Sequence, residues 1–303
     1  TLAQRRSQVD LSITDPAFLD RNLAAGLDLF YIQRNLLAIA NYRERRAGFA
    51  VRAGYAFNER LRQTWAYTLT NREIFDVSAS ASQFVREQEG ETLLSQIGQT
   101  IAFDFRDSII DPRRGGVLRL GTDFAGLGGD VAYIRARVDG TYFFPLESYF
   151  GDPDYVLSVS GSVGYLQPLF NKEDRIVDRF FLGGENLRGF RIAGAGPRDL
   201  DTRDSLGGRF LWTQSTELRY PLPLPAELGL IGRVFVDVGS LSQSESSQPG
   251  ARVADDASPR VGAGVGISWR SPFGLINIDL AQAVVKKSYD ETQVFRFGFG
   301  TRF

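Results

Sequence analysis

The sequence contains no cysteine, no histidine and no methionine among its 303 residues. Disulfides, metal sites built on histidine or cysteine, and Ser-His or Cys-His nucleophiles are therefore excluded. The absence of cysteine also fits an oxidising envelope compartment. No run approaches the roughly 20 apolar residues of a membrane helix, so a helical membrane protein is excluded as well.

Charge of one sign is also lacking. The 35 basic and 36 acidic side chains nearly cancel, and no basic run is interleaved with stacking aromatic residues. A nucleic-acid partner is therefore not expected. The chain starts at Thr1, without Met and without a charged and then apolar leader. We expect that any signal peptide has been removed or lies outside this chain, as part of a longer protein.

The most regular feature that is present is alternation of apolar and polar residues. Near the end of the chain, Phe295, Phe297 and Phe299 share one parity, while Arg296 and Gly298 share the other. Because successive side chains of a strand point to opposite faces, one face is aromatic and the other is small or cationic. In a soluble sheet the apolar face would turn to a core, whereas in a membrane barrel it turns to lipid.

This alternation recurs and predicts about thirteen strands. They are expected near residues 9–13, 24–33, 49–57, 65–69, 97–105, 118–124, 134–144, 155–165, 210–220, 234–238, 261–269, 276–280 and 293–303. A soluble β-sandwich or propeller would show similar alternation. Two features favour an all-β transmembrane antiparallel β-barrel: short turns alternate with longer polar loops, and aromatic residues lie near strand ends on the apolar parity. These aromatic residues are Tyr142, Phe144, Tyr155, Tyr165, Trp212, Tyr220 and Trp269.

The alternation stops between about residues 170 and 206, which is long for a structureless loop. This segment contains DRFFLGG at 178–184, LRGF at 187–190, GPRD at 196–199 and LGG at 206–208. It resembles the sixth extracellular loop of the BamA family of outer-membrane assembly barrels, whose signature is (V/L)RG(F/Y). LRGF alone is a weak signal. The preceding glycine pair, the following GPRD and the five strands before a C-terminal phenylalanine match the family in order, as do DPRRGG at 111–116, GLGGD at 126–130 and FVDVG at 235–239.

The resemblance implies a specific set of contacts. In the family, this loop folds back into the barrel lumen and its arginine pairs with acidic residues on the neighbouring strands. Carried over by motif, the loop lock consists of Arg188, Gly189, Phe190, Glu217, Phe235 and Asp237. Parity independently places Glu217 and Asp237 on the polar, lumen-facing side. The alternative is that Arg188 is a solvated loop arginine and that the two carboxylates are ordinary lumen charges.

The resemblance also bears on domain organisation. The family barrel has sixteen strands, eleven of them before this loop, whereas the sequence shows about eight before it. We therefore expect a single transmembrane barrel domain over residues 1–303 that begins at the family's fourth strand. The first three strands and the POTRA domains would be missing. Such a barrel would have two open edges that expose unpaired backbone in lipid.

The function implied by the resemblance is that of an outer-membrane insertase, without a covalent step and without a cofactor or a metal. It would offer a strand edge at a lateral seam and template incoming barrel proteins by β-augmentation. The expected location is the outer membrane of a Gram-negative bacterium. The expected partners are outer-membrane lipids and lipopolysaccharide, unfolded outer-membrane proteins, and assembly-complex lipoproteins that would bind through the absent POTRA domains. The last strand is itself the aromatic-ended signal that such machinery recognises, with Phe295, Phe297, Gly298, Phe299 and Phe303.

Other functions remain as alternatives. The first is a related translocation barrel, either TamA or a two-partner secretion transporter, and the second is a passive porin. A barrel enzyme such as a lipase is disfavoured, because the chain has no histidine for its usual machinery.

Three weaker site candidates have structural interpretations. The run YRERR at 42–46 would contact lipid phosphates if it lay at the membrane surface, but we favour a solvated turn. Asp104, Asp107 and Asp111 lack the spacing of an EF-hand calcium loop, so we favour a structural turn there too. The glycines at 262, 264 and 266 share one face and are expected to leave room in the lumen for the inserted loop.

Overall fold

The computed structural model describes residues 6–246, 250–271 and 274–299. Its main element is a 13-stranded sheet whose strand order follows the order along the chain. All neighbouring strands in this sheet are antiparallel. The predicted all-β class and the predicted number of strands are therefore confirmed.

The main sheet accounts for most of the chain. Its strands are β1 (Arg6–Asp15), β2 (Leu23–Asn35), β3 (Arg43–Ala56), β4 (Leu61–Phe75), β5 (Gly90–Asp104), β6 (Gly115–Gly129), β7 (Tyr133–Pro145), β8 (Val156–Pro168), β11 (Phe210–Pro221), β12 (Leu230–Ser242), β14 (Arg260–Ser271), β15 (Gly274–Val285) and β17 (Phe295–Phe299). Two small sheets pair β9 (Gly189–Phe190) with β16 (Thr292–Gln293) and β10 (Arg198–Asp199) with β13 (Val253–Ala254).

The helices of the described residues are all short. They are α1 (Leu37–Ala40), α2 (Gln83–Arg86) and α3 (Glu147–Phe150), with 3-10 turns at Phe18–Asp20, Ile176–Asp178 and Ala226–Leu228. Within the described ranges, no helix has the length and the apolar character needed to cross a membrane.

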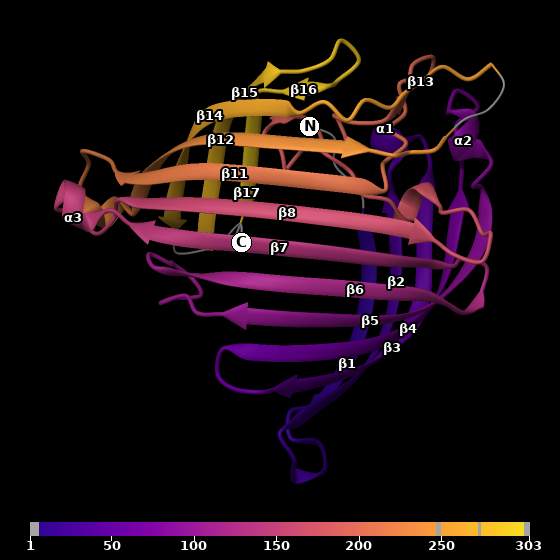
Figure 1. The fold of residues 1–303 in the computed structure, drawn as a ribbon, viewed down its shortest axis with the longest axis horizontal. Coiled ribbons are helices and arrows are strands. Elements are labelled where there is room, and N and C mark those ends of the chain that lie inside the picture. The colour runs from indigo at the N-terminus through magenta and orange to yellow at the C-terminus, as the bar shows by residue number, and fades with distance from the viewer. Residues whose placement is uncertain (1–5, 247–249, 272–273, 300–303) are drawn as a thin grey trace.

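The main sheet is strongly curved (Figure 1). Strands β7, β8 and β11 cross the front of the view, while the indigo strand β2 and the yellow strands β15 and β17 run steeply behind them. Helix α3 lies at one end of the central strands, and α2 and β13 lie at the opposite end. Among the described residues, β1 pairs only with β2, and β17 pairs only with β15, so the sheet has two edges.

The sheet is apolar on its outside and polar on its inside. Strand β12 shows this most clearly: Val234 and Val236 are 42% and 44% exposed, whereas Arg233 and Asp237 are 3% and 2% exposed. On β15, Asp279 is fully buried between exposed neighbours of the opposite parity. A soluble sheet would bury the valines and solvate the charges. The observed order is that of a barrel whose outer surface faces lipid.

The inside of the sheet is filled by the segment 170–206. Leu182, Leu187 and Phe190 are fully buried, and they pack with Leu211 of β11 and Leu241 of β12. A second buried cluster contains Ile176 from the first limb of the segment, which leads to the LRGF motif, and Leu206 from the second limb, which leads back to β11. Both pack against α2 and the turn after β2. The segment without alternation is thus a folded part of the interior.

One interpretation from the sequence was wrong. The basic run at 42–46 is not a solvated turn, because Arg43 starts β3 and Glu44 is only 2% exposed. The Glu44 carboxylate accepts a hydrogen bond from Arg46 at 2.5 Å, and Arg45 donates to Glu73 of β4 at 2.6 Å. The Glu44–Arg46 pair lies on the lumen face and the Arg45–Glu73 pair lies on the opposite face, so charges on both faces find partners and the run does not end the strand.

Candidate functional site: the loop inside the barrel

The structure brings Arg188 into contact with the lumen faces of β11 and β12. Arg188 donates from Nε and Nη2 to the two Asp237 carboxylate oxygens, each at 2.7 Å, and from Nη1 to Glu217 at 2.5 Å. Its backbone N–H also donates to Asp237, at 3.0 Å. The guanidinium carbon lies 3.3 Å from the centre of the Phe235 ring. The bidentate geometry uses the planar fork of arginine, which lysine lacks.

Strand register explains why these partners converge. Ser215 of β11 lies opposite Asp237 of β12, and Glu217 lies opposite Phe235. Residues two apart on one strand share a face, so all four side chains point into the lumen. Ser215 also donates to Asp237 at 2.7 Å and accepts from Arg188 at 3.1 Å. Each carboxylate oxygen of Asp237 therefore has a defined donor.

The ion pairs continue along the inner face of the sheet. Arg233 of β12 lies 3.4 Å from Glu217 and donates to Asp279 of β15 at 2.6 Å. Positive and negative side chains thus alternate from the loop, through β11 and β12, to β15. Burial costs each charge much of its hydration, and the opposite charges beside it offset that cost.

Close backbone approach requires glycine at position 262 of β14. A Cβ atom built there would lie 1.8 Å from the Arg188 carbonyl oxygen. Gly264 and Gly266 serve other neighbours: a Cβ at 264 would lie 2.8 Å from the Phe235 ring, and one at 266 would lie 2.3 Å from the Asp279 carboxylate. Of these three glycines, Gly262 is therefore the one that makes room for the loop backbone itself.

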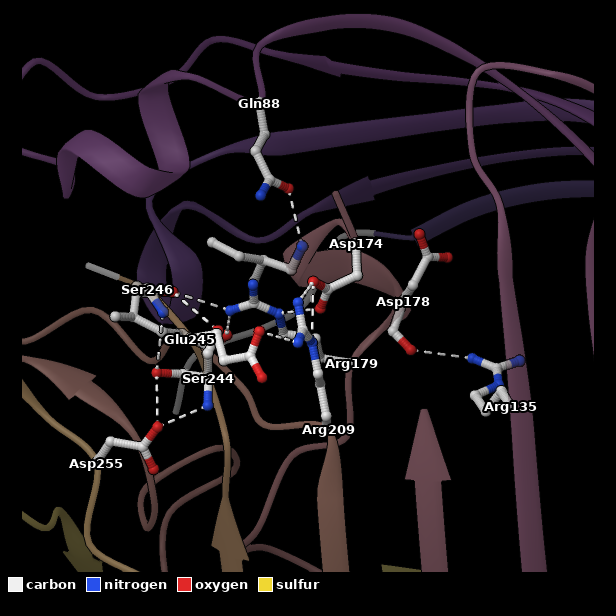
Figure 2. A network of polar contacts seen from close by, with 12 residues as sticks. Gln88, Arg135, Asp174, Asp178, Arg179, Arg209, Ser244, Glu245, Ser246 and Asp255 are labelled. Atoms are coloured by element: carbon white, nitrogen blue, oxygen red, sulfur yellow. Dashed lines mark hydrogen bonds and ion pairs between the residues drawn. The ribbon is translucent and has the colours of Figure 1, made fainter. Parts of the chain in front are cut away.

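A second anchor, which the sequence did not suggest, holds the first limb of the loop. Asp178 accepts two hydrogen bonds from Arg72 of β4, at 2.6 and 3.2 Å, and both side chains are at most 5% exposed. Tyr133 of β7 donates to the same carboxylate at 3.3 Å. Arg135 donates to the Asp178 carbonyl at 3.1 Å, as Figure 2 shows. Parity places Arg72 in the lumen, but it cannot name a partner 106 residues away.

A third polar cluster closes the base of the same limb (Figure 2). The Asp174 carboxylate accepts hydrogen bonds from Arg179 at 2.5 Å and from Arg209 at 2.6 Å. Burial alone would raise the pKa of Asp174, but the hydrogen bonds from Arg209 and Arg179 outweigh it, so its pKa lies below the ordinary value. Arg209 also pairs with Glu245, in the loop after β12. The cluster therefore ties two long loops together.

The GPRD motif holds the tip of the segment. Asp199 accepts a hydrogen bond from the Ser82 hydroxyl at 2.6 Å, and nearby Asp204 accepts one from the Ser82 backbone N–H at 2.6 Å. Asp204 also accepts from Asn41 at 2.6 Å. Ser82 immediately precedes α2, so these bonds fix the segment to the first long loops.

The residues of the last strand lie as their parity predicts. Phe295, Phe297 and Phe299 are 50–70% exposed on the outside, and Gly298 lies on the inner face opposite Asn277 of β15. Phe303, which the sequence analysis also assigned to this signal, lies outside the described residues.

The three aspartates at 104, 107 and 111 do not form a common site. Asp104 pairs with Arg106, and Asp107 accepts from the backbone N–H groups of the same turn. Asp111 instead reaches across to Arg270 of β14, at 2.6 Å. Within the described ranges, no cluster of three or more metal-ligating side chains is present.

Comparison with known proteins identifies relatives over the whole chain. The Omp85 superfamily domain matches residues 1–303. The outer membrane protein assembly factor BamA of Neorickettsia risticii is 33% identical over 284 residues, which cover 94% of this chain and 37% of that protein. The mouse sorting and assembly machinery component 50 homolog is 36% identical over 166 residues, which cover 54% of this chain and 34% of that protein. The chain thus spans about a third of these relatives.

Solved structures show the same fold. The crystal structure of BamA from Haemophilus ducreyi lacking POTRA domains 1–3 has a TM-score of 0.86 at 20% identity, covering 96% of this chain and 61% of that one. CdiB from Acinetobacter baumannii has a TM-score of 0.59 at 14% identity, covering 96% and 49%.

Proposed function

Because this chain belongs to the Omp85 superfamily, we propose that it is the barrel of a BamA-type insertase that assembles β-barrel proteins into the outer membrane. The family places it among the outer-membrane β-barrels of bacteria or mitochondria, and not among enzymes. We favour a Gram-negative bacterium, because bacterial BamA matches 94% of the chain whereas mouse component 50 matches 54%.

The observation that carries this proposal is the buried Arg188 of the LRGF motif, bonded to Asp237 and Glu217 inside the barrel. It fixes a large folded loop behind strands β11 to β15, close to the edge strand β17. An edge strand presents unpaired backbone groups to which another strand can add. Loop and edge together give the chain a means to template incoming strands by β-augmentation.

The proposed substrates are unfolded outer-membrane proteins with aromatic-ended last strands, and the proposed surroundings are outer-membrane lipids and lipopolysaccharide. Assembly-complex lipoproteins would bind through POTRA domains. No cofactor is required, since strand pairing and local disturbance of the bilayer need no covalent chemistry.

The test is reconstitution of the full-length protein in liposomes with an unfolded β-barrel substrate. We expect faster appearance of heat-modifiable, folded substrate than in empty liposomes. A rate equal to that of empty liposomes would contradict an insertase.

The runner-up is a two-partner secretion transporter, because CdiB shares the fold. Its TM-score of 0.59, against 0.86 for BamA, makes this the weaker candidate. In the same liposomes, a transporter would carry an extended secreted substrate into the interior and leave the barrel substrate unfolded. A porin would show large, steady conductance steps, whereas a barrel filled by its loop should show small and irregular ones.

A further inference from the structure

The last strand changes partner partway along its length. Residues Phe295–Phe299 pair with β15, and the Val294 carbonyl still accepts from Ala281 of β15 at 2.8 Å. Just before this point, the chain pairs with the inserted loop instead: Thr292 lies opposite Phe190, and Gln293 lies opposite Gly189. The segment just before β17, at Thr292 and Gln293, is therefore paired with the LRGF motif.

Further bonds extend this contact on both sides. The Arg191 N–H donates to the Glu291 carbonyl at 2.9 Å, and the Glu291 N–H donates to Gly194 at 2.8 Å. The Glu291 carboxylate accepts from Arg198 of the GPRD motif at 2.9 Å. Arg296 donates from the inner face of β17 to the Phe190 carbonyl at 3.3 Å. We call this set of contacts between residues 189–198 and 291–296 the clasp.

The clasp begins at the residue after Arg188. Arg188 is bonded to Asp237 through its side chain and through its own N–H, and Gly189 and Phe190 then pair with β16. Gly189 has a φ of +92°, and a Cβ there would lie 2.9 Å from the Ala283 N of β15. The backbone of residues 188–190 is so closely packed that it has little room to move independently. A displacement of Arg188 from Asp237 must therefore move the strand to which its neighbours are paired.

We propose that Glu291 and Arg296 are positioning residues that couple the Arg188 lock to the position of the last strand. In the clasped position, the strand bends inward to the loop. In the alternative position, it would continue along β15, which extends to Val285. Since Leu280 lies opposite Phe295, continuing that register would put Glu291 opposite Val284. The two arrangements form a two-state element that the lock biases.

The consequence for activity rests on the proposed function. In the clasped position, the last strand leaves β15 after Ala281, and among the described residues the ladder between β15 and β17 covers only Ile276–Leu280 of β15. In the straightened position, the last strand itself would cover that edge. The loop lock would thus decide how much strand edge is available for an incoming strand to join.

Residues 1–303 contain no cysteine, so two thiols introduced into this part of the protein can be cross-linked without competition from other thiols of the same part. In the full-length protein in membranes, with Glu291 and Arg296 kept, Arg191→Cys with Thr292→Cys reports the clasped position, where the Arg191 N–H bonds to the residue before Thr292. Val284→Cys with Thr292→Cys reports the straightened position, in which Thr292 would lie opposite Ala283, next to Val284. All three positions are partly exposed or exposed. A short bifunctional thiol reagent is applied without substrate, and only the heat-modifiable, folded band is scored.

Arg188→Ala should lower the 191/292 cross-link and raise the 284/292 cross-link, changing their ratio by about fivefold or more, the lower end of usual coupling energies. Arg188→Lys, a milder change, should shift the ratio in the same direction. Coupling is reciprocal, so Arg296→Gln should expose the loop at residues 178–199 to protease, although it contacts neither Asp237 nor Glu217. The control is Arg52→Ala, which removes a lumenal pair with Asp28 outside the loop and should change neither readout.

The coupling is wrong if both cross-link yields are unchanged in folded Arg188→Ala and Arg188→Lys proteins. It is also wrong if the 191/292 yield falls while the 284/292 yield stays low, since the strand would then fray instead of switching. These measurements need no assembly activity. A barrel that switches its cross-links but assembles nothing would refute the proposed function and leave the coupling intact, whereas an active insertase without switching would refute the coupling alone.

Discussion

At the scale of single residues, the interior depends on one arginine with several partners. Arg188 joins two carboxylates, one hydroxyl and one aromatic ring, with an exposed fraction of only 4%. A buried ion pair contributes little net stability compared with a well-packed apolar replacement, because desolvation offsets its attraction. Removing one partner is different, since it leaves a buried charge without compensation.

The first prediction follows from this asymmetry. Arg188→Ala should leave the barrel inserted but destabilise the loop by about 3–5 kcal/mol, making residues 178–199 sensitive to protease from outside and lowering assembly activity. Arg188→Lys should restore only part of the effect, because it keeps the charge but loses the fork. Asp237→Ala or Glu217→Ala should give related, milder defects. In a double-mutant cycle, Arg188→Ala and Asp237→Ala should be strongly non-additive. If the effects of Arg188→Ala and Asp237→Ala simply add, and those of Arg188→Ala and Glu217→Ala add as well, these residues do not interact and the lock does not exist.

The second prediction concerns Gly262. Replacing it with alanine would put a Cβ where the Arg188 carbonyl now lies, at 1.8 Å, so the loop backbone must move. We expect protease sensitivity of the loop similar to that of Arg188→Ala, although no charge is changed. The matched control is Gly121→Ala on β6, where the nearest atom to a new Cβ is 3.9 Å away. Equal protease resistance of both variants would mean that the loop does not need this close approach.

At the scale of elements, strand orientation is the property to test. Phe297 of β17 lies on the outside, so Phe297→Arg should cost about 2–4 kcal/mol near the bilayer midplane and impair insertion. Gly298 lies on the lumen side, and Gly298→Ser should be far milder. Folding assays of both variants in lipid check this order. The opposite ranking would reverse the assignment of the two faces.

The same scale shows what could be predicted from the sequence. Period-2 alternation is a local property, so all thirteen strands of the main sheet could be found from it, including the lumen side of β11 and β12. The start of β3 was missed, because charges at 43–46 read as solvated, although Glu44 pairs with Arg46 on the lumen face and Arg45 pairs with Glu73 on the opposite face. The pairing of β9 with β16 could not be found, because two residues are too few to show any period.

The anchor between Arg72 and Asp178 was missed for another reason. Both residues were visible as polar positions, but only the fold shows that the first limb of the loop crosses to β4. The pair of Arg188 with Asp237 was suggested by the motif, not by alternation, since parity gives a face and never a partner. Contacts between distant elements thus needed either a family resemblance or the structure.

At the scale of the whole molecule, the polarity of the fold is inverted relative to a soluble sheet. The outside of β12 and its neighbours is aliphatic, and the inside combines buried ion pairs with a hydrophobic cluster that the loop itself supplies. The loop therefore acts as the core of the barrel. Three anchors tie it to other elements: Asp174 pairs with Arg209 beside β11, Asp178 with Arg72 of β4, and Arg188 with Asp237 of β12.

The final prediction concerns the two edges of the sheet. In the described part of the chain, β1 is paired only with β2 and β17 only with β15, so both edges present backbone N–H and C=O groups. In the hydrocarbon layer each unpaired group costs several kcal/mol, because no water can replace the missing partner. Residues 1–303 refolded alone in detergent or lipid should therefore give no heat-modifiable, protease-resistant monomer. If the family resemblance holds, the native upstream segment supplies further strands, and adding it should restore a heat-modifiable, protease-resistant monomer. A compact, protease-resistant monomer of residues 1–303 would instead mean that the two edges meet or are otherwise satisfied.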